Sequence, residues 1–177
     1  MTRILKLAAV IFAACLVQTN LADLLRVSGV APDFMIAALA ALSPYCGWMG
    51  GLTAGALMAM LYDASVGYAL ALDLILYGIL GYFSPLMYEG LLARTRRFSR
   101  FRSLPLMLMA WLMSAIREIA DIGYLFLIGA EQGLVTLVRA LIACTLTALV
   151  TLPVNLIVSR LLQQRKTGEQ SGLNGRN

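Results

Sequence analysis

The feature that most constrains this chain is a succession of six apolar segments that takes up nearly its whole length. They cover residues 4–25, 32–46, 47–62, 68–88, 104–128 and 134–162. Only 13% of all residues are charged, whereas about a quarter are charged in a typical soluble domain. A soluble fold would leave much of this apolar surface exposed, so each segment is expected to be a membrane-spanning helix.

These segments predict an all-α integral membrane protein with about six transmembrane helices in one bundle. The transmembrane domain is expected to cover residues 1–163, and residues 164–177 are expected to form a polar, disordered cytoplasmic tail. The first segment has an alternative interpretation, because Arg3 and Lys6 followed by LAAVIFAAC resemble a signal peptide with a lipobox-like end. The apolar run continues past Cys15 to Leu25, which favours a span over a cleaved leader.

Basic residues predict the orientation of the bundle. Eleven of the fourteen Lys and Arg fall in three groups, which are Arg3 with Lys6, the five arginines from Arg94 to Arg102, and the tail from Arg160 onward. Six crossings from a cytoplasmic N-terminus place all three groups in the cytoplasm, as the positive-inside rule requires. The predicted outer loops hold Arg26, Asp63 and Glu131. Both termini are therefore expected in the cytoplasm, and the short segment 32–46 is expected to cross.

Small residues recur every fourth position in the third segment. The row consists of Gly47, Gly51, Gly55 and Ala59, and its next position is Asp63. Residues four apart lie nearly above one another on a helix, so the row makes a groove that admits another helix backbone in lipid. We expect this neighbour to be segment 68–88 of the same chain, and the alternative is the transmembrane helix of a partner protein.

Five charged residues lie away from the ends of the last three segments, where charge is costly. They are Asp73, Arg117, Glu118, Asp121 and Arg139. Arg117 and Asp121 are four apart and are expected to pair on one helix face, while Asp73 and Arg139 can pair across the bundle. We interpret these residues as internal ion pairs that fix helix packing. A partner interface and a substrate or proton path are the alternatives.

The sequence does not predict an enzyme. Tyr62-Asp63 and Leu72-Asp73 superficially resemble the carboxylates of intramembrane aspartyl proteases, but the glycine-flanked GxGD element is missing. The chain has no HExxH or GxSxG motif and no histidine, and Cys15, Cys46 and Cys144 show no metal-binding spacing. We therefore expect no metal, no cofactor and no nucleic-acid partner.

Motifs between residues 31 and 85 resemble a known family in their order. Ala31-Pro32-Asp33 opens the second segment, with Pro32 suited to the first position of a helix and Asp33 to its positive end. The glycine row follows, and the later motif residues are Leu61-Tyr62-Asp63, Gly67, Tyr77, Gly78 and Gly81. This order resembles the rod shape-determining protein MreD family, whose members show a Pro-Asp helix start and a glycine-rich helix that ends in Asp.

The resemblance implies a non-catalytic subunit of the bacterial cell-elongation (rod) complex in the inner membrane. Such a subunit supports cell shape and peptidoglycan synthesis through helix contacts with an MreC-like protein, a RodA-type glycosyltransferase and a class B penicillin-binding protein, and indirectly with MreB filaments. The resemblance also implies a fold similar to the substrate-binding subunit of energy-coupling-factor transporters. A small-molecule-binding subunit of a vitamin-type transporter is therefore the alternative.

Overall fold

The structure is a computed structural model, and it describes residues 3–27, 29–66, 70–95, 103–129 and 133–163. Within these ranges the chain forms helices and no β-strand. The elements are α1 (Arg3–Asn20), the 3-10 helix η1 (Ala22–Leu25), α2 (Phe34–Leu42), α3 (Trp48–Val66), α4 (Leu70–Thr95), α5 (Leu104–Leu127) and α6 (Leu134–Gln163). The all-α prediction is confirmed, and each apolar segment contains one α-helix. The predicted tail, Gly67 and Glu131 lie outside the described residues.

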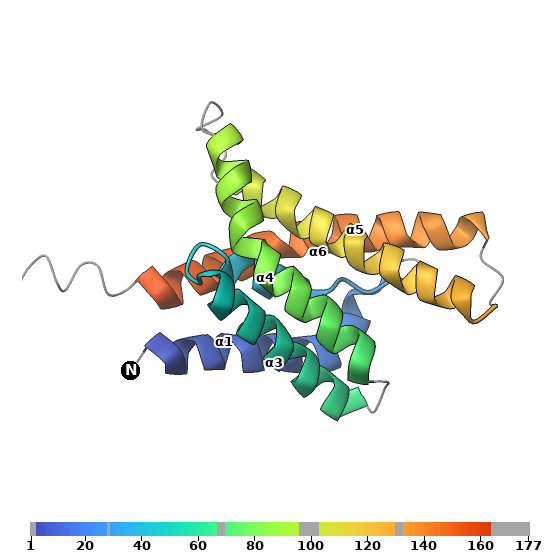
Figure 1. The fold of residues 1–177 in the computed structure, drawn as a ribbon, viewed down its shortest axis with the longest axis horizontal. Coiled ribbons are helices and arrows are strands. Elements are labelled where there is room, and N and C mark those ends of the chain that lie inside the picture. The colour runs from blue at the N-terminus through green and yellow to red at the C-terminus, as the bar shows by residue number, and fades with distance from the viewer. Residues whose placement is uncertain (1–2, 28, 67–69, 96–102, 130–132, 164–177) are drawn as a thin grey trace, which may run out of the picture.

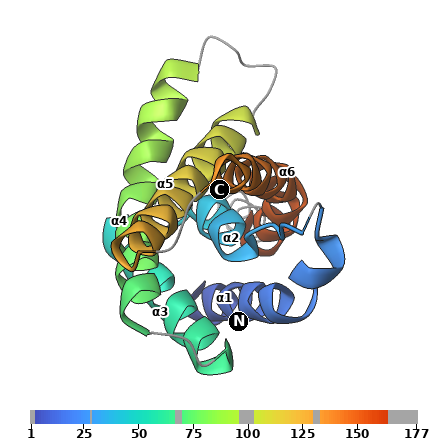
Figure 2. The same cartoon turned by 90° about the vertical axis from the view of Figure 1, so that its right-hand side faces the viewer.

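α2 is the shortest α-helix in the described part of the chain and lies at the centre of the bundle. α2 contacts all five other α-helices, and Figure 2 shows it surrounded by them. Its nine residues are all buried, which accounts for a helix that is apolar on every side. α2 ends before the predicted bound because Pro44 follows its C-cap residue Ser43 and favours a turn over further helix.

α3 and α4 form the most extensive helix contact in the described part of the chain. They run antiparallel and cross in front of α1 in Figure 1, joined by the segment that contains residues 67–69. α4 contains Pro85, which removes a backbone hydrogen bond inside the helix. Figure 1 shows α4 bending away from the bundle toward its C-terminal end.

The outer faces of the bundle are apolar. Large hydrophobic side chains are exposed on every α-helix except α2, for example Phe12, Met60, Ile75, Ile119 and Leu149. By length and hydropathy, two helical stretches among the described residues are long and apolar enough to cross a membrane, Leu72–Leu91 and Leu134–Leu162. These features are compatible with a membrane location, and the six crossings stay a proposal.

Candidate functional site

The N-terminus of α2 is capped by a buried aspartate. One oxygen of Asp33, Oδ1, accepts hydrogen bonds from the backbone N–H groups of Met35 at 2.9 Å and Ile36 at 3.0 Å. These two donors have no partner inside the helix, and a carboxylate also suits the positive end of the helix dipole. The expected placement of Asp33 is therefore seen. Pro32 precedes the cap residue and does not occupy the first helical position.

The other oxygen of Asp33 ties α2 to two long helices. Tyr77 of α4 donates its hydroxyl to Oδ2 at 2.6 Å, and Arg117 Nη1 of α5 lies 3.2 Å from the same oxygen. The guanidinium of Arg117 also lies 5.7 Å from the centre of the Tyr77 ring. A tyrosine, an arginine and a helix N-terminus thus share one carboxylate.

Two further side chains satisfy the backbone at the start of α2. The N–H of Asp33 donates to Oγ1 of Thr147 in α6 at 3.0 Å, and the N–H of Phe34 donates to Oε1 of Gln18 in α1 at 2.7 Å. We refer to Gln18, Asp33, Tyr77, Arg117 and Thr147 as the Asp33 cluster. The cluster joins α2 to four of the five other α-helices.

The geometry of the Asp33 cluster is that of a structural link. Both carboxylate oxygens of Asp33 already accept hydrogen bonds or an ion pair, and the side chain is only 6% exposed. A group whose lone pairs are engaged and shielded from solvent is poorly placed to remove a proton from a substrate. Losing one member of a buried pair leaves an uncompensated charge and costs about 3–5 kcal/mol.

The expected ion pair between Arg117 and Asp121 is present, and Arg117 also contacts a second carboxylate on another element. Its closer carboxylate is Asp33, whereas Nη2 lies 3.8 Å from Asp121 Oδ2, and the Asp121 side chain is 34% exposed. Sequence reasoning placed the pair within one helix and missed the contact between helices. The sequence contains an indication of this contact, since Asp33 and Arg117 carry opposite charges in two different apolar segments. Glu118 is half-buried, and it makes no hydrogen bond or ion pair with the described part of the chain.

The expected pair between Asp73 and Arg139 is wrong. No ion pair joins these residues in the described part of the chain. Arg139 is exposed on α6, and Asp73 is partly buried on α4. The reason is the helix order, because α5 packs against both α4 and α6, and these two share hardly any contact.

The glycine row meets α4 through its backbone. A Cβ atom on Gly51 would overlap the carbonyl oxygen of Gly81, and a Cβ on Gly55 would overlap that of Tyr77. Gly81 in turn lies against the Gly51 carbonyl. We call this contact the α3–α4 seam. Its space is filled by the same chain, which leaves no room there for a partner helix.

The two ends of the row differ from the expectation. Gly47 precedes α3 and has open space around it, so it takes no part in the seam, whereas Ala59 is fully buried. Asp63 is not in an outer loop. α3 continues to Val66, so Asp63 stays within the helix, where it is 1% exposed and neither oxygen has a hydrogen-bond partner among the described residues.

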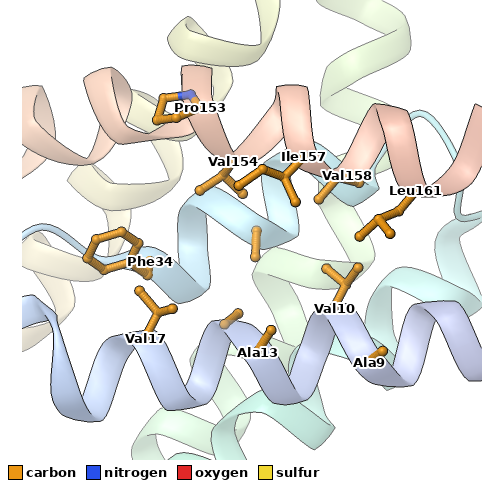
Figure 3. Close-up of a pocket in the computed structure, with 12 residues that line it drawn as sticks. Ala9, Val10, Ala13, Val17, Phe34, Pro153, Val154, Ile157, Val158 and Leu161 are labelled. Carbon is orange, nitrogen blue, oxygen red and sulfur yellow. The ribbon is translucent and has the colours of Figure 1, made fainter.

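A separate cavity of about 440 Å³ lies between α1 and α6, with α2 as its floor (Figure 3). We call it the α1–α6 groove. Its lining side chains are all apolar, and they are Ala9, Val10, Ala13, Ala14, Val17, Phe34, Ala38, Pro153, Val154, Ile157, Val158 and Leu161. Its walls offer a hydrophobic ligand contact area but no side-chain hydrogen bond.

Among the described residues, no group of three or more His, Cys, Asp or Glu side chains is arranged to hold a metal ion. Comparison of the chain with protein families, curated proteins and solved structures finds no match.

Proposed function

We propose that this chain is a non-catalytic membrane subunit of the bacterial cell-elongation complex. The proposal is supported by the positions of the residues that resemble the MreD family. Asp33 and Tyr77 meet in the Asp33 cluster, and Gly51, Gly55 and Gly81 form the α3–α4 seam. These motif residues contact other helices of the same chain. Internal contacts of this kind suit a rigid scaffold whose outer helix faces bind partner proteins.

A location in the inner membrane, with multiple crossings, agrees with the surface of the bundle. Among the described residues, five α-helices expose large apolar side chains, and α2 at the centre exposes none. The nine residues of α2 rise about 14 Å, roughly half of a hydrocarbon core of about 30 Å. Irregular backbone at membrane depth is tolerated where protein surrounds it, and the Asp33 cluster supplies such surroundings at one end of α2.

The vitamin-transporter alternative is supported by one observation, the α1–α6 groove. Small-molecule sites combine an apolar lining with a few convergent polar groups that fix orientation. The groove has the first property, with Phe34 as its aromatic residue, and its lining contains no polar side chain. This composition favours the scaffold over a binder of polar vitamins.

Affinity purification tests the proposal. The tagged full-length chain is extracted from bacterial membranes in mild detergent, and the recovered proteins are quantified against an unrelated multi-pass protein with the same tag. We expect enrichment of an MreC-like protein, with a RodA-type glycosyltransferase and a class B penicillin-binding protein. Recovery of a paired ATPase and a coupling subunit would support the transporter instead. Enrichment of neither set contradicts the proposed assembly.

A further inference from the structure

The α1–α6 groove has an apolar body with positive charge at one end. Leu161 lines the groove, and its carbonyl oxygen accepts a hydrogen bond from Lys6 Nζ at 2.6 Å. Arg160, the next residue toward the N-terminus of α6, is exposed in the last turn of that helix. Lys6 and Arg160 therefore stand where the two helix ends meet.

The dimensions of the groove suit a thin apolar chain. Its α1 wall runs from Ala9 to Val17, which corresponds to about 12 Å at 1.5 Å per residue. A helix segment of that length with a diameter of about 10 Å occupies roughly 900 Å³. The cavity holds about 440 Å³, half of that volume. An extended hydrocarbon chain fits where a whole helix does not.

The side chains on the α1 side of the groove are short, so a ligand can enter the groove from the side. Ala9 and Ala13 line the groove and are exposed, because their methyl groups do not reach across to α6. The α6 wall is built from larger side chains, including Val154 and Ile157 (Figure 3). The opening between these two walls faces outward, where lipid would lie if the bundle is in a membrane.

We propose that the α1–α6 groove binds an acyl chain of an anionic phospholipid, with the lipid phosphate beside Lys6 and Arg160. Charge complementarity selects this occupant, since basic groups at the cytoplasmic surface attract anionic headgroups and the apolar walls accept the tail. The inference rests on the membrane location in the proposed function. It does not depend on the partner proteins.

The purified full-length chain in detergent tests this inference by native mass spectrometry. After delipidation, the protein is titrated with phosphatidylglycerol or with phosphatidylcholine of the same acyl chains. We expect one phosphatidylglycerol bound in preference to phosphatidylcholine. Lys6→Gln keeps a donor for the Leu161 carbonyl but removes the charge, and it should weaken phosphatidylglycerol binding about fivefold.

A matched pair of variants locates the site. Ala13→Phe places a ring in the groove and should abolish the preferred binding. Ala8→Phe makes the same change at an exposed position of α1 that does not line the groove, and it should bind as the wild type does. Ala9→Phe, also on the groove wall, provides a second test if Ala13→Phe does not fold.

Three results would overturn the inference. They are equal binding of both lipids, no lipid bound by the wild-type chain, and unchanged binding by folded Ala13→Phe and Ala9→Phe. If these variants instead keep the lipid and lose an MreC-like partner, the groove seats a protein helix. Lipid binding without recovery of rod-complex partners supports the groove and contradicts only the proposed assembly.

Discussion

Two pairs of helices in this bundle have small residues at the same spacing but differ in how closely the helices pack. In the α3–α4 seam, Gly51 and Gly55 lie four apart and touch the backbone of α4. In the α1–α6 groove, Ala9 and Ala13 lie four apart, and the space in front of them stays open. One contact is closed, and the other is a cavity of about 440 Å³.

The partner helix explains the difference. α4 presents Gly81 and the backbone carbonyl of Tyr77 to Gly51 and Gly55 of α3, so both backbones approach closely at these positions. α6 presents branched residues to α1, among them Val154 and Ile157, and the cavity separates these side chains from Ala9 and Ala13. Small residues on one helix are therefore insufficient for a close contact, because the facing helix must supply small residues at the matching positions.

The largest expected effect is in the seam. Gly55→Leu inserts a side chain against the Tyr77 carbonyl, where not even a Cβ atom fits, and backbone on the facing helix cannot move aside cheaply. Overpacking a core costs about 1–3 kcal/mol, and this change should reach or exceed the upper end of that range. We expect a lost or strongly lowered thermal transition in detergent, measured by intrinsic fluorescence.

Gly47→Leu is the matched control for the seam, because it lies in the same row with no atom near its Cβ position. It should melt close to the wild-type temperature. Equal melting of Gly55→Leu and Gly47→Leu would show that the α3–α4 contact is not as close as described.

An intermediate effect is expected at the Asp33 cluster, which links the two contacts. Tyr77 contacts α3 in the seam through its backbone carbonyl and binds Asp33 through its hydroxyl. Phe34, which follows Asp33 in the chain, lines the groove. Arg117→Met leaves the Asp33 carboxylate without its ion pair and should cost about 3 kcal/mol. In the double variant with Asp33→Asn, stability should largely recover, since the asparagine oxygen still caps α2 and its amide nitrogen can donate to the Tyr77 hydroxyl oxygen where Asp33 accepts from it. Chemical unfolding of both variants in detergent measures the difference.

Asp121→Asn is the control for the cluster. Its carboxylate lies 3.8 Å from Arg117 and is partly exposed, so its loss should cost less than about 1 kcal/mol. Additive losses in the Arg117→Met and Asp33→Asn variants, with no recovery, would contradict the pair between helices. A larger loss for Asp121→Asn would make Asp121, within α5, the main partner of Arg117.

The sequence predicts those features that depend on neighbouring residues. Apolar runs predict six helices, Pro32-Asp33 predicts the start of α2, and the glycine row predicts a close contact. Features that depend on helix order could not be read in the same way. Arg117 forms an ion pair with Asp33, which is distant in sequence, because α5 packs on α2. Asp73 does not pair with Arg139, because α5 packs between α4 and α6.

The α1–α6 groove is a further feature that the sequence of one helix does not predict. Ala9 and Ala13 have the spacing of a helix contact, and the sequence of α1 alone does not say whether a helix, a lipid or a cavity faces them. The answer depends on α6, whose branched residues lie far away in the chain. Burial of Asp63 was missed because α3 extends one turn beyond the apolar run.

The smallest expected effect completes the comparison. Ala13→Leu makes in the groove a change similar to Gly55→Leu in the seam, yet the added atoms enter a cavity bounded by apolar side chains. Substitutions at exposed positions without special contacts usually change stability by less than about 0.5 kcal/mol. We expect Ala13→Leu to melt within a few degrees of the wild type in the detergent assay used for the seam.

Lipid makes this last prediction sharper. If an acyl chain occupies the groove, Ala13→Leu displaces part of it, and added phosphatidylglycerol should then stabilise the variant less than the wild type, because a ligand stabilises the state that binds it. In lipid-free detergent the two proteins should melt alike. A large loss in the absence of lipid would mean that α1 and α6 are in close contact. The distinction between seam and groove would then disappear.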